Sequence, residues 1–67
     1  MINIIVNGKN ESVNDKCSIT KMIELLGYKN DAFAVALNGT FITFKMYEKT
    51  KLKQCDKIEI LAPMVGG

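Results

Sequence analysis

Apolar and polar residues alternate near both ends of the chain, which predicts β-strands there. Residues 2–6 form a short apolar run, an Asn-Gly pair follows at 7–8, and residues 9–13 come next. Asn-Gly between two strand segments favours a two-residue hairpin, because both positions of its turn need positive φ. Residues 57–62 form the last predicted strand, and Pro63 ends it because proline has no N–H to donate to a ladder.

A helical pattern lies between these strands. Ser18 is a suitable N-cap, and Gly27 suits the left-handed position that follows a helix. A helix of about two and a half turns is unstable in isolation, so it must lie against a sheet. The apolar residues that recur at helical spacing between these ends are Ile19, Met22, Ile23 and Leu26.

The middle of the chain predicts a second hairpin. Residues 33–37 indicate a strand, an Asn-Gly pair follows at 38–39, and residues 40–43 form a short returning strand. Residues 44–48 have no clear period, and one turn of helix or 3₁₀ structure is expected there. Leu52 is an isolated apolar residue in a lysine-rich stretch, and it is expected to anchor a surface loop.

The order of these elements predicts the fold class. Pairing the two most apolar strands, the first and the last, in parallel at the sheet centre buries the most apolar area, with the helix across the concave face. This is an α+β, β-grasp arrangement with a mixed four- to five-stranded sheet. Residues 1–62 are expected to form the domain, and residues 63–67 a free C-terminal tail. Alternation directs Ile58 and Ile60 toward the core and Leu61 away from it.

Composition narrows the possible chemistry. The chain has 67 residues, so it forms one small domain without room for an active-site cleft inside its core. It has no histidine, which excludes His-dependent triads and removes the commonest metal ligand, so neither a metal site nor a catalytic residue is expected. Cys17 and Cys55 lack CxxC spacing and are expected to be reduced structural thiols, with one reactive thiol as the alternative.

The charge pattern gives little support for a nucleic-acid partner. The net charge is +2, and all nine basic residues are lysines, so the usual bidentate reader of phosphates and bases is missing. The lysines at 49, 51, 53 and 57 are expected to form a solvated face, or alternatively to contact an acidic partner. No signal-peptide pattern or membrane-length apolar run is present, so a cytoplasmic monomer is expected.

The C-terminal Gly-Gly pair is the strongest candidate for chemistry. Gly66 and Gly67 have no side chains, so they can pass extended through a narrow slot and leave the terminal carboxylate unhindered for attack on ATP. Five extended residues reach at most about 16 Å, which is enough to enter a partner's active site. Met64 and Val65 are apolar, whereas a merely solvated tail would more often be polar; a frayed terminus is the alternative.

Three stretches carry a resemblance to a known family. They are VALNG at 35–39, DKIEI at 56–60 running into APM at 62–64, and the terminal Gly-Gly at 66–67. In these stretches, and in its length, the chain resembles the small sulfur-carrier proteins of the ubiquitin-like β-grasp group. The resemblance is greatest to the ThiS carriers of thiamine biosynthesis, and it covers the whole chain.

The resemblance implies that the chain is a carrier and not an enzyme. A ThiF-like adenylyltransferase would activate the Gly67 carboxylate with ATP, and a persulfide sulfur would displace AMP to leave a thiocarboxylate. A ThiG-like thiazole synthase would then accept that sulfur. The chain itself would bind no cofactor, and Met64, Val65 and Gly66 would thread into the partner.

Two departures from the family pattern concern the surface. Relatives often have glycine where this chain has Cys55, so that turn is expected to hold a strained non-glycine residue. Residues 43–47 lack the Pro-Arg that often begins this stretch. The partner is expected to dock on the sheet face that the helix leaves bare, through Leu61 and Phe41. For Leu61 ordinary packing is an equal alternative, and for Phe41 packing is favoured over docking.

Other functions are compatible with the same pattern. A carrier similar to the small subunit of molybdopterin synthase would use the same chemistry with another sulfur acceptor. A non-covalent β-grasp module for RNA or protein would tolerate loss of Gly66 and Gly67, and RNA binding would depend steeply on salt. Conjugation in the manner of ubiquitin would instead produce isopeptide adducts on lysines.

Overall fold

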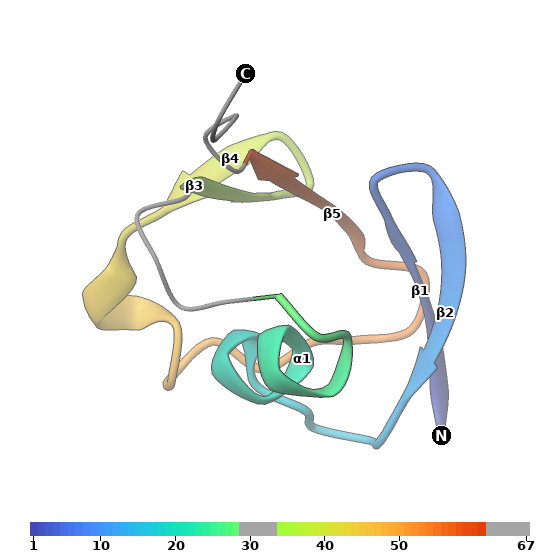
Figure 1. Cartoon of the computed structure of the whole chain (residues 1–67). Coiled ribbons are helices and arrows are strands. Elements are labelled where there is room, and N and C mark those ends of the chain that lie inside the picture. The colour runs from blue at the N-terminus through green and yellow to red at the C-terminus, as the bar shows by residue number, and fades with distance from the viewer. Residues whose placement is uncertain (29–33, 62–67) are drawn as a thin grey trace.

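The computed structural model describes residues 1–28 and 34–61 of the chain (Figure 1). Predictions that fall on residues 29–33 or 62–67 lie outside the described residues, and the boundary between domain and tail therefore stays a prediction. The described elements, in chain order, are β1 (Ile2–Val6), β2 (Lys9–Val13), α1 (Ile19–Leu25), β3 (Ala34–Leu37), β4 (Thr40–Ile42), the 3₁₀ helix η1 (Phe44–Met46) and β5 (Lys57–Leu61).

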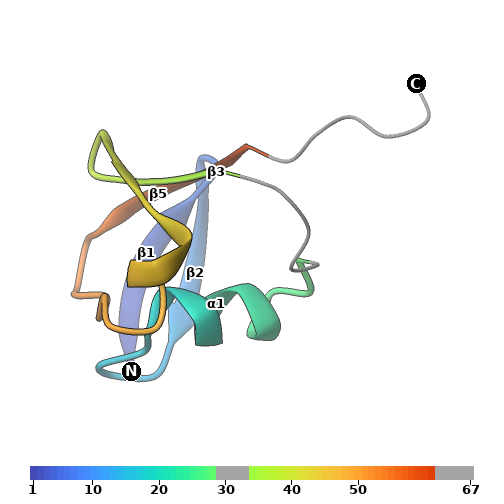
Figure 2. The same cartoon turned by 90° about the vertical axis from the view of Figure 1, so that its left-hand side faces the viewer.

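The five strands form one mixed sheet in the order β2-β1-β5-β3-β4. β1 and β5 are parallel, with Ile5 opposite Lys57 and Val6 opposite Ile58, whereas the other neighbouring pairs are antiparallel. α1 lies on one side of this sheet, as the two views show (Figures 1 and 2). The α+β, β-grasp arrangement expected from the sequence is confirmed, including the parallel pairing of the first and last strands.

Both Asn-Gly pairs form the tight turns that were predicted. Asn7 and Gly8 have φ values of 49° and 82°, and Asn38 and Gly39 have values of 50° and 87°. Positive φ at both central positions is the requirement of the type I′ hairpin turn. These turns set the registers of the β1–β2 and β3–β4 hairpins, in which the closing pairs directly flank each Asn-Gly step.

The helix begins and ends where its sequence signals predicted. The Ser18 hydroxyl accepts a hydrogen bond from the Lys21 N–H at 3.1 Å, which satisfies one of the free amides of the first turn. Gly27 follows the C-cap with φ of +80°, a conformation that glycine adopts without strain. The apolar face of α1 packs on the sheet, with Ile19, Met22 and Ile23 buried.

The core lies between α1 and the sheet and is extended by the link before β5. Ile58 of β5 is fully buried at its centre, and Tyr47 and Leu52 join from the link. The Leu52 N–H also donates to the Cys17 carbonyl at 2.7 Å, so the predicted anchor of this loop is confirmed. Ile5, which sits on the opposite sheet face from Ile4, is half-buried.

The two cysteines differ in environment, which corrects one prediction. Cys17 is buried in the core, whereas Cys55 is exposed in the turn before β5. A structural, packed thiol therefore describes Cys17 only. Cys55 has φ of +71°, so the expected non-glycine residue in a left-handed turn is confirmed. Its N–H donates to the Asn3 carbonyl at 2.8 Å, a bond that holds the turn against β1.

We expect Cys55→Gly to stabilise the protein by about 1 kcal/mol, because glycine adopts positive φ without the clash of a Cβ but loses more chain entropy on folding. The exposed thiol contributes little packing that could be lost. The change in the free energy of unfolding is measured by urea unfolding, with the same dependence on urea concentration fitted for all variants. The matched control is Cys55→Ala, which removes the thiol but keeps the Cβ, and it should stay within about 0.5 kcal/mol of the parent. A glycine variant no more stable than the alanine variant would contradict the strain.

Candidate functional site

The predicted chemical group itself lies outside the described residues, because Met64, Val65, Gly66 and Gly67 all fall within residues 62–67. The part of the site that the structure describes is the end of β5, since the chain continues directly from Leu61 to the C-terminal segment.

The sheet face opposite α1 carries an exposed apolar patch. Along β5 the buried positions alternate with exposed ones, so Leu61 points away from the core. Its partner on β3 is Ala34, and the next pairs along β3 place Ala36 opposite both Glu59 of β5 and Phe41 of β4. We define the outer patch by the apolar residues that β3, β4 and β5 place on this face, which are Leu61, Ala34, Ala36 and Phe41.

The two large members of the outer patch are open to solvent. The exposed fraction is 55% for Leu61 and 64% for Phe41. On this face, β3 places only Ala34 and Ala36 between them, and Ala36 is buried although it does not belong to the core cluster. Both predicted docking residues thus lie on the same bare face, and Phe41 is mostly exposed there, whereas packing was favoured for it. Their contact with a partner stays a prediction.

Side-chain amides support β5 at both of its ends, a feature that sequence reasoning missed. The Asn38 Oδ1 accepts from the Lys57 N–H at 2.9 Å, and its Nδ2 donates to the Asp56 carboxylate at 3.0 Å. At the other end, the Asn7 Oδ1 accepts from the Ile60 N–H at 2.7 Å. The sequence signal for these bonds is the asparagine in each hairpin turn, but the preference of such turns for Asn-Gly already explains both asparagines.

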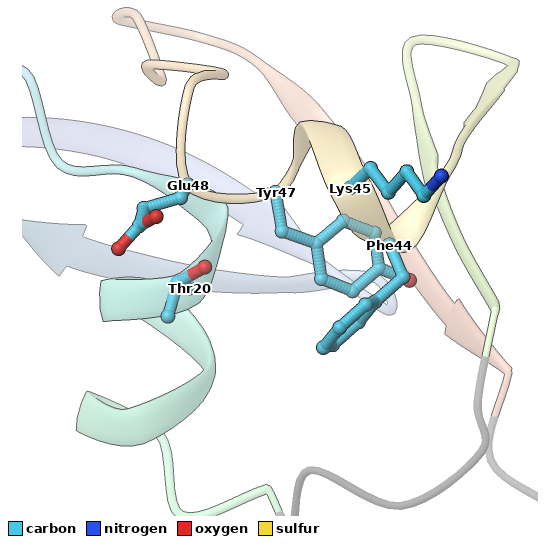
Figure 3. Close-up of a pocket in the computed structure, with 5 residues that line it drawn as sticks. All are labelled: Thr20, Phe44, Lys45, Tyr47 and Glu48. Atoms are coloured by element: carbon cyan, nitrogen blue, oxygen red, sulfur yellow. The ribbon is translucent and has the colours of Figure 1, made fainter.

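A shallow pocket of about 280 Å³ lies where α1 meets the link that contains η1 (Figure 3). Thr20 and Glu48 lie at one end, and Phe44 and Lys45 at the other, with Tyr47 between them. The rings of Phe44 and Tyr47 meet edge to face with centroids 5.5 Å apart. The lining has no thiol, imidazole or pair of carboxylates, so it offers an apolar notch and no set for acid–base catalysis.

Burial controls the protonation of the groups that pack into the core. Desolvation raises the pKa of the Cys17 thiol, and the nearby charges of Lys21 and Lys51 partly oppose that shift. Desolvation likewise raises the pKa of Tyr47, against the effect of a hydrogen bond from the Val35 backbone. Both groups therefore stay neutral near pH 7, and neither has the lowered pKa of an activated nucleophile.

The remaining surface shows no other concentration of reactive groups within residues 1–28 and 34–61. No cluster of three or more Cys, Asp or Glu residues there could hold a metal ion. The lysines at 49, 51, 53 and 57 are all exposed, as predicted for a solvated face. In the same described part of the chain, no helix has the length and apolar character needed to cross a membrane.

Comparison with known proteins gives consistent matches over nearly the whole chain. The model of the ThiS family matches residues 4–67. The crystal structure of the thiamine biosynthesis protein (ThiS) from Geobacter metallireducens is 29% identical, with a TM-score of 0.83 over 98% of this chain and 100% of that one. A solution structure of a thiamine biosynthesis protein from the same organism has a TM-score of 0.79 at 29% identity, covering 98% and 88% of the two chains.

A curated relative is more distant in sequence. The "uncharacterized protein ycf40" of Porphyra purpurea is 24% identical over 66 residues, which cover 98% of this chain and 93% of that protein.

We expect thiol-specific labelling of the native protein at neutral pH to show one fast and one slow thiol. Cys55 is exposed and should react within the fast phase, whereas Cys17 is buried with a raised pKa and should react only as the protein opens. Cys55→Ser should remove the fast phase alone. A fast phase that survives this substitution would contradict the assignment.

The raised pKa of Cys17 also has a consequence for stability at alkaline pH. The folded state binds this proton more tightly than the unfolded state, so its contribution to stability is complete below the ordinary cysteine pKa of about 8.5 and is lost as pH rises above it. In Cys17→Ala, the free energy of unfolding should therefore decrease less as pH rises above this value than it does in the parent protein.

Proposed function

This chain belongs to the ThiS family, and from that membership we propose that it is a sulfur carrier of thiamine biosynthesis whose Gly67 carries the sulfur as a thiocarboxylate. The observation that carries the proposal is the family match over residues 4–67, which includes the C-terminal Gly-Gly pair. The 29% identity to a thiamine biosynthesis protein over that protein's full length supports the same conclusion.

The proposed reaction explains why the carrier needs no catalytic group of its own. A carboxylate is a poor electrophile, because hydroxide or oxide would have to leave when sulfur attacks. A ThiF-like partner with ATP converts the Gly67 carboxylate to an acyl-adenylate and releases pyrophosphate. A persulfide sulfur then attacks the acyl carbon and AMP leaves, and a second thiol cleaves the resulting acyl disulfide to free the thiocarboxylate. All acids, bases and nucleophiles for these steps come from partner proteins.

The outer patch is the proposed docking surface for the adenylating partner. Leu61 is its member closest in sequence to the C-terminal segment, so a partner that covers Leu61 also meets the chain that follows it. Phe41 extends the apolar area across β3 to β4. Large exposed apolar residues gathered on one face of a small domain are typical of a protein interface. A ThiG-like thiazole synthase is the proposed acceptor of the sulfur.

We expect deletion of Gly66 and Gly67 to leave the fold unchanged and to abolish ATP-dependent adenylation by the partner, because the reacting carboxylate is displaced by two residues. Intact-mass spectrometry of the parent from its native cell should show species in which one oxygen is replaced by sulfur, and the truncated protein should show none. Normal thiazole synthesis supported by the truncated protein would exclude the proposal and favour a non-covalent binding module.

We expect Leu61→Asp to preserve the fold but to reduce adenylation at least about tenfold, since an unpaired carboxylate would be buried in an apolar interface. The measurement is the initial rate of pyrophosphate release against carrier concentration. Leu25→Asp is the matched control: Leu25 is 52% exposed, close to the 55% of Leu61, but it lies on α1. Equal activity of the two variants would remove Leu61 from the docking surface.

A further inference from the structure

The parallel ladder between β1 and β5 ends before β5 does. Its last backbone bond runs from the Asn7 N–H to the Ile58 carbonyl, at 2.9 Å. The chain then turns at Gly8 into β2, whereas β5 continues through Ile60 to Leu61. On this side of β5, the backbone of β1 therefore offers no partner to Ile60, although Ile60 is a buried core residue.

The side chain of Asn7 fills this position in the ladder. Its Oδ1 accepts from the Ile60 N–H at 2.7 Å, and its Nδ2 lies 3.3 Å from the Ile60 carbonyl oxygen and 3.4 Å from the Tyr28 hydroxyl. A carboxamide has the same donor and acceptor as a peptide group, so it can continue a strand ladder. Asn7 thereby connects the first hairpin, the chain just after α1 and the end of β5.

We infer that Asn7 is a positioning residue for the modification of Gly67, an inference that rests on the proposed function. It holds the end of β5 in one place on the domain, so Leu61 of the outer patch and the chain that follows it meet the adenylating enzyme from a fixed origin. Without the amide, Ile60 loses both side-chain bonds, and pairing with β3 alone holds the strand end, which is then less ordered when the partner binds. Preorganisation of this kind increases the rate of productive encounter without adding any contact to the partner.

The second hairpin provides a closely matched control. Asn38 occupies the same position in an identical Asn-Gly turn, with φ of 50° against 49° for Asn7. Its Oδ1 accepts from the Lys57 N–H at 2.9 Å, so it also supports β5 through a side-chain amide. Lys57 begins the strand, however, and Leu61 ends it. A purely structural role would affect both positions alike, whereas positioning of the strand end requires Asn7 only.

The test compares Asn7→Gly with Asn38→Gly, because glycine keeps the positive φ of each turn and removes only the amide. Amide hydrogen exchange should show loss of protection of about tenfold or more at Ile60 in Asn7→Gly and at Lys57 in Asn38→Gly. Urea unfolding of both variants gives the loss of stability against which the activities are compared.

Adenylation kinetics distinguish a purely structural role from positioning of the strand end. The rates are measured with the ThiF-like partner and MgATP at varied carrier concentration. We expect kcat/KM for the carrier to fall about tenfold in Asn7→Gly and less than about twofold in Asn38→Gly. Equal falls in the two variants, with the parent active, would overturn the positioning role and leave the proposed function intact. A parent protein that is not adenylated at all would overturn the proposed function and the inference with it.

Tyr28→Phe refines the assignment. This substitution removes the hydroxyl that Asn7 contacts at 3.4 Å but leaves both bonds between Asn7 and Ile60. The expected kcat/KM is within about twofold of the parent, since the strand end keeps its support. A fall as large as that of Asn7→Gly, without loss of Ile60 amide protection, would place the effect in Tyr28 and contradict the role given to the strand-end bonds.

Discussion

The parallel pairing of β1 with β5 is the constraint on which the rest of the structure depends. It brings the first and last strands together at the middle of the sheet, so the β1–β2 hairpin lies on one side of β5 and the β3–β4 hairpin on the other. The buried face of β1 and β5, which includes Ile58, packs against the apolar residues of α1. A domain of this size has few apolar residues to bury, and placing its two most apolar strands together uses them fully.

The same pairing determines how the chain leaves the domain. Since β5 is central, β1 pairs with its first residues, Lys57 and Ile58, and β3 pairs with Ile58 to Leu61, so the strand that leads to the C-terminal segment has a neighbour along its whole length. The alternation of β5 then directs Ile58 and Ile60 inward and Leu61 outward. One short strand therefore packs against the core with one face and exposes Leu61 at the end of the other, five residues before the Gly-Gly pair.

In the proposed function, the described residues supply the fold and a docking surface, and the chemistry is left to partners. The pocket between α1 and the link that contains η1 has no group of residues suited to acid–base catalysis, and burial keeps the Cys17 thiol protonated near neutral pH. This division fits a carrier in the ThiS family, whose reacting group would be its own terminal carboxylate. In the proposed function, a well-ordered β5 before the C-terminal segment reduces the conformational entropy that the chain loses when a partner binds.

The sequence by itself determined the elements whose causes are local. Ser18 and Gly27 mark the ends of α1, and both Asn-Gly turns form as predicted, because caps and turns depend on residues within a few positions of one another. Alternation along β5 placed Leu61 outward for the same reason. The pairing of the end strands followed from their high apolar content, since few other arrangements bury it.

Only the tertiary structure decided the features that depend on contacts between distant segments. The bonds between Asn7 and Ile60 span 53 positions, and no local pattern distinguishes an asparagine that merely turns the chain from one that also supports another strand. The exposure of Cys55 and of Phe41 was likewise set by which neighbours the fold brought to them. Periodicity and propensity describe a residue's own segment, whereas hydrogen bonding and burial across the sheet exist only once the strands have closed around the core.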